Sequence, residues 1–258
     1  MRIERLDFLL ELTRRRIVER YVGASHILFW IVVSPLVPVV TNLLIFYFVA
    51  RMPQVRDMGL ATYGLFLLSG LLPYRILQRA LSEAGDLLTA SMELLRSTAF
   101  PVPYLSLVST LGMAVEFAIQ LALLVVLVVW WRGAPGPALL LLPVAFVLLF
   151  ALMVGLSWTF SVLGHFVREV NEITSITMVG LLYLTPAVYP VDAVPASLQS
   201  LILLNPLSHV VIAFRDALLS APEMHWQSWA IFAALAAAAL AAGAALVSAV
   251  RGYVGDMV

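Results

Sequence analysis

The chain has 258 residues, of which 62% are hydrophobic and 12% are charged, and its mean hydropathy is +1.01. These values predict a protein that crosses a membrane several times. The formal net charge is zero, and the chain contains neither lysine nor cysteine. These two absences exclude a phosphate-binding loop of the Walker A type, a Schiff-base lysine, disulfides and cysteine-ligated metal sites.

The N-terminal segment, residues 1–22, mixes charged and apolar residues at helical spacing, with Ile3, Leu6 and Leu10 on one face. This pattern predicts an amphipathic helix that lies on the membrane surface, and a soluble helix packed on a partner is the alternative. No cleavable signal is expected, because the first long apolar run starts only near Ile27 and lacks a small-residue cleavage site after it.

Six apolar stretches are predicted to span the membrane, each close to the length that a bilayer requires. The first contains Pro35 and Pro38, which should kink it, and its Thr41 and Asn42 should face protein or water rather than lipid. The sequence thus predicts a single all-α polytopic membrane domain with six transmembrane helices. The predicted spans are residues 27–49, 59–81, 104–131, 138–163, 173–189 and 230–250.

Two polar segments interrupt the spans. Residues 82–100 carry leucines at near-helical spacing among acidic residues and are followed by Pro101, which predicts a short amphipathic helix between spans two and three. Residues 165–172 form a second polar connection. Six spans place both termini on one side, and that side holds eleven of the fifteen arginines. The positive-inside rule therefore predicts that the N-terminal helix, both polar segments and the C-terminus are cytoplasmic.

The stretch between spans five and six, residues 190–225, is too apolar for an ordinary external loop. Prolines divide it into pieces that are too short to cross a bilayer, which predicts an extracytoplasmic re-entrant segment of short helices before the last span. Non-helical backbone at membrane depth needs protein or a water-filled cavity around its polar groups. This segment should therefore lie beside a transport pathway or a buried interface.

Glu116 lies near the middle of span three, with Gln120 one helical turn further on the same face. A carboxylate at the bilayer centre is costly, so a functional role is one hypothesis. The other is a protonated or hydrogen-bonded carboxyl that joins spans or subunits. The second hypothesis is favoured, because Arg75 and Arg79 should reach the headgroups and no basic residue stands at matching depth in the other spans.

Patterns typical of catalysis or metal binding are weak. Residues 155–157, Gly-Leu-Ser, form only half of a serine-hydrolase elbow, and no acid or histidine stands at a helpful spacing. The four histidines include no pair at metal-ligand spacing. We therefore predict neither a catalytic residue nor a metal site.

Aromatic residues collect near the outer ends of the spans, including Tyr47 and Phe48 in span one and Tyr183 and Tyr189 in span five. Most such rings anchor a helix at the membrane interface. Those beside the re-entrant segment could instead stack on sugars, whose flat apolar faces suit aromatic rings. Together with Asn42, these four residues form the predicted substrate pathway.

Five segments, spread from end to end, make up a specific pattern. They are RRRIVERYVGASHILFWIVVSPLVPV (residues 14–39), FLLSGLLPYRILQRAL (66–81), LLRSTAFPVPYL (94–105), REVNEITSITMVGLLYLTPAVYP (168–190) and NPLSHVVIAFRDALL (205–219). In this order on a six-span chain, they resemble the permease subunits of ABC-2 type transporters. The closest resemblance is to the branch that exports polysaccharides and polyol phosphates, such as O-antigen, capsule or teichoic acid.

The resemblance implies a homodimer in the cytoplasmic (inner) membrane, with two ATP-binding cassette subunits docked from the cytoplasm. ATP and Mg²⁺ would bind to those partners, so we expect no cofactor in this chain, and no nucleic acid among its partners. A lipid-linked glycan is the implied cargo. The residues implied to couple ATP hydrolysis to transport are Glu83, Asp86, Leu87, Met92, Leu94, Arg96, Arg168, Glu169 and Glu172.

Two alternatives stay open. The chain could be an ABC-2 exporter of a small molecule or lipid, or it could be an intramembrane enzyme, such as a transferase, acting on a lipid-linked substrate. A transferase should show clustered acids, or a basic residue able to hold a diphosphate at one membrane face, whereas the acids here are scattered. A purely structural subunit would leave the re-entrant segment unexplained.

Overall fold

The computed structural model describes residues 11–14, 27–90, 102–133, 136–167, 169–220 and 223–255. Within these ranges all regular structure is helical and no strand occurs. Five helical stretches are long and apolar enough to cross a membrane, and a sixth crossing results if one sharply bent helix pair counts as a span. The predicted all-α polytopic class is therefore confirmed. Most of the predicted N-terminal amphipathic helix lies outside the described residues.

The first span is broken at a proline. Helices α2 (Ile27–Val33) and α3 (Leu36–Leu43) flank a turn at Pro35, and α3 continues directly into the π-helical η1 (Leu44–Val49). Pro35 has no N–H to offer to the helix, which accounts for the break. Pro38 causes no second break, because it lies in the first turn of α3, where backbone N–H groups have no intrahelical partner.

The second span is longer than predicted. A short helix, α4 (Pro53–Asp57), precedes α5 (Leu60–Ala90), which continues past residue 81, so that residues 82–90 extend the span instead of starting a separate helix. No proline interrupts this extension, and its one glycine, Gly85, serves close packing. A Cβ on Gly164 of the neighbouring helix would lie only 2.5 Å from the Gly85 Cα. Residues 91–100 of the predicted coupling segment lie outside the described ranges.

The third and fourth spans are α7 (Val102–Arg132) and the 3₁₀ turn η2 (Pro137–Leu141) followed by α8 (Leu142–Phe166). Helix α9 (Val170–Tyr183) begins the predicted fifth span but has only 14 residues. A bilayer requires about 20, so α9 is too short to cross by itself. The chain turns at residues 184–190 instead of remaining helical to residue 189.

The predicted re-entrant segment contains η3 (Val191–Ala193), α10 (Ala196–Leu204) and α11 (Pro206–Leu219), and α10 and α11 meet at an angle of 93°. The bend has a local cause at Asn205. The following proline keeps this residue out of the helical conformation, and its side chain accepts a hydrogen bond of 3.1 Å from the N–H of Leu207, which caps α11.

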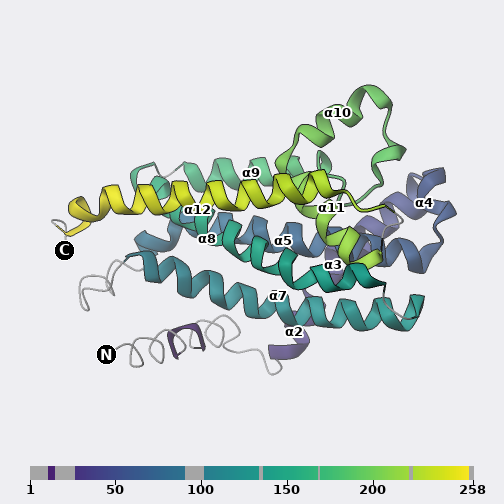
Figure 1. The fold of residues 1–258 in the computed structure, drawn as a ribbon, viewed down its shortest axis with the longest axis horizontal. Coiled ribbons are helices and arrows are strands. Elements are labelled where there is room, and N and C mark those ends of the chain that lie inside the picture. Colours follow the sequence, from purple (N-terminus) through teal and green to yellow (C-terminus); the bar gives the residue numbers. More distant parts are fainter. Residues whose placement is uncertain are drawn as a thin grey trace.

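The long helices lie side by side in one bundle (Figure 1). Helices α4 and α10 occupy one end, which we call the α10 end, and α12 (Trp226–Gly255) finishes at the opposite end. Helix α12 packs on α8, where Gly155 and Gly243 allow the two backbones to touch, since a Cβ on Gly155 would overlap the carbonyl carbon of Ala239. Small residues at helix crossings are typical of packing inside membranes.

Candidate functional site

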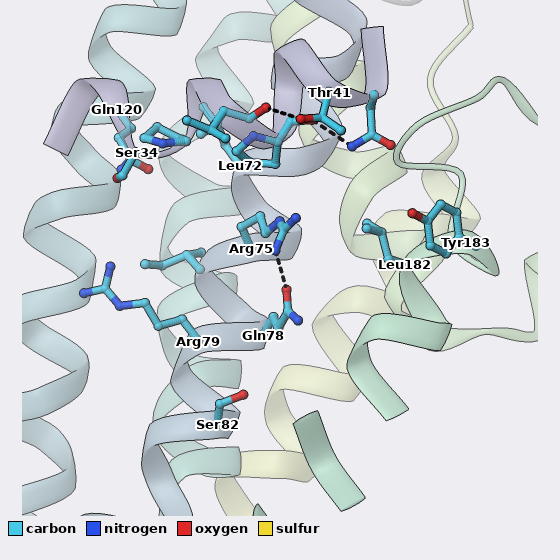
Figure 2. A pocket seen from close by; sticks show the side chains of 15 residues that line it. Ser34, Thr41, Leu72, Arg75, Gln78, Arg79, Ser82, Gln120, Leu182 and Tyr183 are labelled. Carbon is cyan, nitrogen blue, oxygen red and sulfur yellow. Dashed lines mark hydrogen bonds between the residues drawn. The ribbon is translucent and has the colours of Figure 1, made fainter. Parts of the chain in front are cut away.

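A cavity of about 660 Å³ lies between the first span, α5, α7 and α9. Its lining follows α5 from Leu72 to Ser82, a stretch that includes the midpoint of that helix. Polar side chains at this depth of an apolar span point to function by default. Figure 2 shows these side chains around the open space. The polar lining includes Ser34, Thr41, Arg75, Gln78, Arg79 and Gln120.

The buried carboxylate of Glu116 is held by Arg79, across the contact between α7 and α5. The two terminal nitrogens of the guanidinium donate to the two carboxylate oxygens at 2.8 and 3.0 Å, and Arg79 Nε donates to Glu83 at 3.1 Å. Glu116 is only 2% exposed, so this bidentate pair compensates a charge that water does not reach. The carboxyl thus joins two spans.

Two expectations from the sequence are therefore wrong. Arg79 does not extend towards the headgroups, and a basic residue does stand at the depth of Glu116. The arginine side chain is long enough to cross to the neighbouring helix. The ion pair inside the bundle compensates the buried negative charge of Glu116. An arginine that extended to the headgroups would leave this charge without a partner.

Gln120 replaces a backbone hydrogen bond that is missing at the break in the first span. Its amide Nε2 donates to the backbone carbonyl of Ile31 at 3.0 Å. In an unbroken helix that carbonyl would accept from the N–H four residues later, but this position is Pro35, which has none. A backbone carbonyl inside a bilayer needs a hydrogen-bond donor. Gln120 of α7 supplies the donor that Pro35 lacks. The predicted intramembrane glutamine therefore fastens α7 to α2.

The predicted pathway residues separate into two groups. Asn42 and Tyr183 both line the cavity, from the first span and from the end of α9. Asn42 is buried and donates to the carbonyl of Pro38 at 2.7 Å, while 51% of Tyr183 is exposed. The sequence analysis had grouped these two residues in one predicted pathway, and both line the same cavity although they are far apart in the chain.

The other three pathway residues do not line this cavity. Tyr189 is buried, and its hydroxyl donates to the carbonyl of Tyr183, which closes the turn after α9. The ring of Tyr47 stacks on Tyr63 at 6.3 Å between centroids, and half of Phe48 is exposed on the surface of the first span. These rings pack the α10 end of the bundle or face its surroundings.

A second cavity, of about 930 Å³, lies towards the α10 end and holds charged residues that the sequence reasoning missed. The guanidinium carbon of Arg215 lies 3.6 Å from the ring centroid of Phe66, and Nη2 donates to the carbonyl of Ala187 at 3.4 Å. Asp216, 2% exposed, accepts from the backbone N–H of His225 at 3.0 Å and contacts its ring Nδ1 at 2.9 Å. The sole signal in the sequence is an Arg-Asp pair inside an apolar run.

The predicted coupling residues are only partly described. Met92, Leu94, Arg96 and Arg168 lie outside the described ranges. Glu83, Asp86 and Leu87 belong to the last turns of α5, and Leu87 is buried. Glu169 and Glu172 are exposed at the start of α9. The two groups are neighbours, because Gly85 approaches the side chain of Asn171 so closely that a Cβ would overlap it.

Comparison with known proteins shows the family to which this chain is related. The sequence profile of the ABC-2 type transporter family matches residues 8–219. The chain is similar to the O-antigen export system permease protein RfbA of Klebsiella pneumoniae, with 23% identity over 211 residues that cover 81% of this chain and 79% of the relative. It is also similar to the polysialic acid transport protein KpsM of Escherichia coli, with 25% identity over 193 residues, 74% of this chain and 72% of the relative.

These matches confirm the resemblance that the five sequence segments had indicated. The family profile covers most of the chain, from the N-terminal segment to the end of α11. This multi-pass membrane protein belongs to the ABC-2 type transporter family.

Proposed function

We propose that this chain is the membrane-spanning permease subunit of an ABC exporter that moves a lipid-linked polysaccharide across the cytoplasmic membrane. The observation that carries the proposal is the similarity to both an O-antigen export permease and a polysialic acid transport protein over at least 72% of their lengths. The two relatives differ in the glycan named, so the shared property is export of a polysaccharide.

The cavity beside the first span supports this proposal. It lies beside the middle of α5, and hydroxyl, amide and guanidinium groups face it. Sugars require such hydrogen-bonding groups where they pass an apolar layer. The exposed tyrosine at the end of α9, Tyr183, adds a ring on which a sugar face can stack.

We also propose that the working unit is a homodimer with two ATP-binding subunits. Only 17% of the most apolar window of the first span is buried within one chain, as for α12, against 67% for α5, and of the two weakly buried spans only the first lines the cavity. A second copy placed against the first span would complete a pathway of which one chain supplies one wall. The ATP-binding subunits would dock at the end of the bundle where α5 finishes and α9 begins, which would be cytoplasmic together with both termini.

The rival enzyme hypothesis finds little support at Glu116. General acid–base catalysis needs a carboxyl group that can reach the substrate. Both oxygens of Glu116 are engaged by Arg79 and the group is 2% exposed. An ABC-2 exporter of a small molecule or lipid would share this fold, and only the cargo distinguishes it from the proposal.

A test combines purification with an export assay. The tagged chain is purified in mild detergent from its native host, copurifying proteins are identified by mass spectrometry, and ATP hydrolysis is measured with and without vanadate. In parallel, surface polysaccharide is quantified in cells with and without the gene. We expect a stoichiometric ATP-binding subunit, vanadate-sensitive hydrolysis and loss of a surface glycan on deletion. A chain that purifies alone and whose deletion leaves every surface glycan unchanged would refute the proposal.

A further inference from the structure

We propose that Arg75 is an oxyanion-binding residue, whose guanidinium holds a phosphate or carboxylate group of the cargo in the cavity beside the first span. The inference rests on the proposed function for the identity of the cargo. The site itself is inferred independently of that function, from the position and the contacts of the Arg75 side chain.

Arg75 lies at the midpoint of α5, a helix that is long and apolar enough to cross a membrane. Fifteen residues of α5 precede it and fifteen follow, so each end of the helix is about 22 Å away. A hydrocarbon core of about 30 Å that is centred on this helix would place the Cα of Arg75 about 15 Å from either headgroup layer. A charged residue at this depth is rare, because it is costly to insert, and it marks a functional site by default.

The charge of Arg75 is not neutralised by any described carboxylate. Its one hydrogen bond runs from Nη1 to Oε1 of the neutral Gln78, at 3.3 Å, and no acidic side chain in the described ranges lies within ion-pair distance. Arg79, one turn away, differs in this respect, because Glu116 and Glu83 engage its three nitrogens. The two arginines therefore do different things: Arg79 joins helices, and Arg75 offers its charge to the cavity.

The surroundings suit an oxyanion. Arg75 is exposed, although its neighbours Tyr74 and Ile76 are buried, and it faces the space that Figure 2 shows between the first span and α9. A guanidinium has five N–H donors in a planar fork that matches phosphate and carboxylate oxygens. One donor is engaged here, which leaves four for a ligand. The volume of about 660 Å³ is in the range of pockets that hold small ligands.

Two parts of a lipid-linked polysaccharide could supply the oxyanion. One is the phosphate of the lipid carrier, and the other is an acidic group along the sugar chain itself. The chemistry at Arg75 is the same for both, so the experiment has to separate them with different probes.

The test measures binding to the purified complex in detergent by microscale thermophoresis. The probes are a short polyprenyl diphosphate, the matching uncharged polyprenol, and a lipid-free acidic oligosaccharide such as oligosialic acid. The variants are Arg75→Gln, Arg75→Lys and the control Arg56→Gln, which removes an equal charge from the exposed surface of α4, outside the cavity. Loss of a charge-assisted hydrogen-bond pair predicts at least tenfold weaker binding of the anionic probe.

We expect Arg75→Gln to lose that affinity, Arg75→Lys to retain part of it, and Arg56→Gln to behave like the unmodified chain. Preference for the polyprenyl diphosphate would assign the oxyanion to the carrier, and preference for the oligosaccharide would assign it to the glycan. Equal binding of all probes by Arg75→Gln and the unmodified chain would overturn the proposal. So would loss of the dimer in Arg75→Gln with unchanged binding per chain, because Arg75 would then pair with the second copy.

A parallel export assay keeps this inference separate from the proposed function. If Arg75→Gln exports the surface glycan at the unmodified rate and binds the anionic probes normally, the oxyanion site is refuted while the exporter stands. If the unmodified chain exports nothing and purifies without an ATP-binding subunit, the exporter is refuted, and the binding data alone decide whether Arg75 holds an oxyanion.

Discussion

The ion pair between Arg79 and Glu116 offers the sharpest test of how this bundle is held together. Removing one partner of a buried pair costs about 3–5 kcal/mol, because the other charge is left uncompensated. Arg79→Gln leaves the carboxylate of Glu116, which is 2% exposed, without its cation. We therefore expect the free energy of unfolding to fall by about 3–5 kcal/mol. Glu116→Gln should cost less, about 2 kcal/mol, because Arg79 is 26% exposed and retains Glu83 at 3.1 Å.

The double variant, Arg79→Gln with Glu116→Gln, should recover part of the stability, since it leaves no unpaired charge at Glu116. We expect it to be more stable than Arg79→Gln alone, so the coupling free energy between the two positions should exceed the cost of Glu116→Gln and reach about 3 kcal/mol. The assay is unfolding by SDS in mixed micelles, followed by the fluorescence of the chain's six tryptophans.

A matched control lies one turn away. Arg75→Gln removes the same charge from the same helix, but its guanidinium has no carboxylate among the described residues, so its removal leaves no charge uncompensated and should not destabilise the bundle. Additive effects of the two pair variants, or equal losses from Arg75→Gln and Arg79→Gln, would show that the pair does not stabilise the bundle.

Three further changes test other contacts. A Cβ at Gly70 would lie 2.7 Å from a carbonyl of the turn after α9, so Gly70→Val should cost about 1–3 kcal/mol in the same unfolding assay, whereas Gly180→Val, at a glycine with open space, should not. Gln120→Leu should lower the free energy of unfolding by about 1–3 kcal/mol, because the carbonyl of Ile31 loses its donor. In a Pro35→Ala background the cost should be much smaller, because the backbone N–H of residue 35 is restored and can donate to that carbonyl. Equal costs in both backgrounds would contradict this role of Gln120. Alanine at Tyr183 should slow glycan flux roughly two- to tenfold with unchanged stability, and unchanged flux would leave its ring as a simple interface anchor.

Hydropathy and proline positions were enough to predict the fold class and most spans, because both act locally along the chain. The break at Pro35 is such a case, as is the sharp bend before Pro206. The early end of α9 and the extension of α5 to Ala90 were not predicted. Apolar residues alone do not show where a helix ends when packing against neighbours decides it.

The contacts within the site could not be predicted, because a single sequence does not show how each helix is rotated about its axis. Glu116 and Gln120 were identified as residues that needed partners, since polar groups inside a span rarely stand alone. Their partners, Arg79 and the carbonyl of Ile31, follow only from which faces of α5, α7 and α2 meet. Arg75 was expected at the headgroups for a different reason, namely that span two was predicted to end at residue 81 and not at Ala90.

The glycine contact between α8 and α12 limits how this protein can move. At Gly155 and Gly243 the two helices touch through backbone atoms, so no side chain stands between them that could change rotamer to let one slide past the other. Helices α5 and α8 approach each other equally closely at Gly85 and Gly164, so backbone contacts join α5, α8 and α12. If the proposed cargo is wider than the cavity, the first span and α9, which carry Asn42 and Tyr183, are the helices that have to be displaced. In the proposed exporter, α5 would form one wall of the passage, and the first span and α9 would form the other.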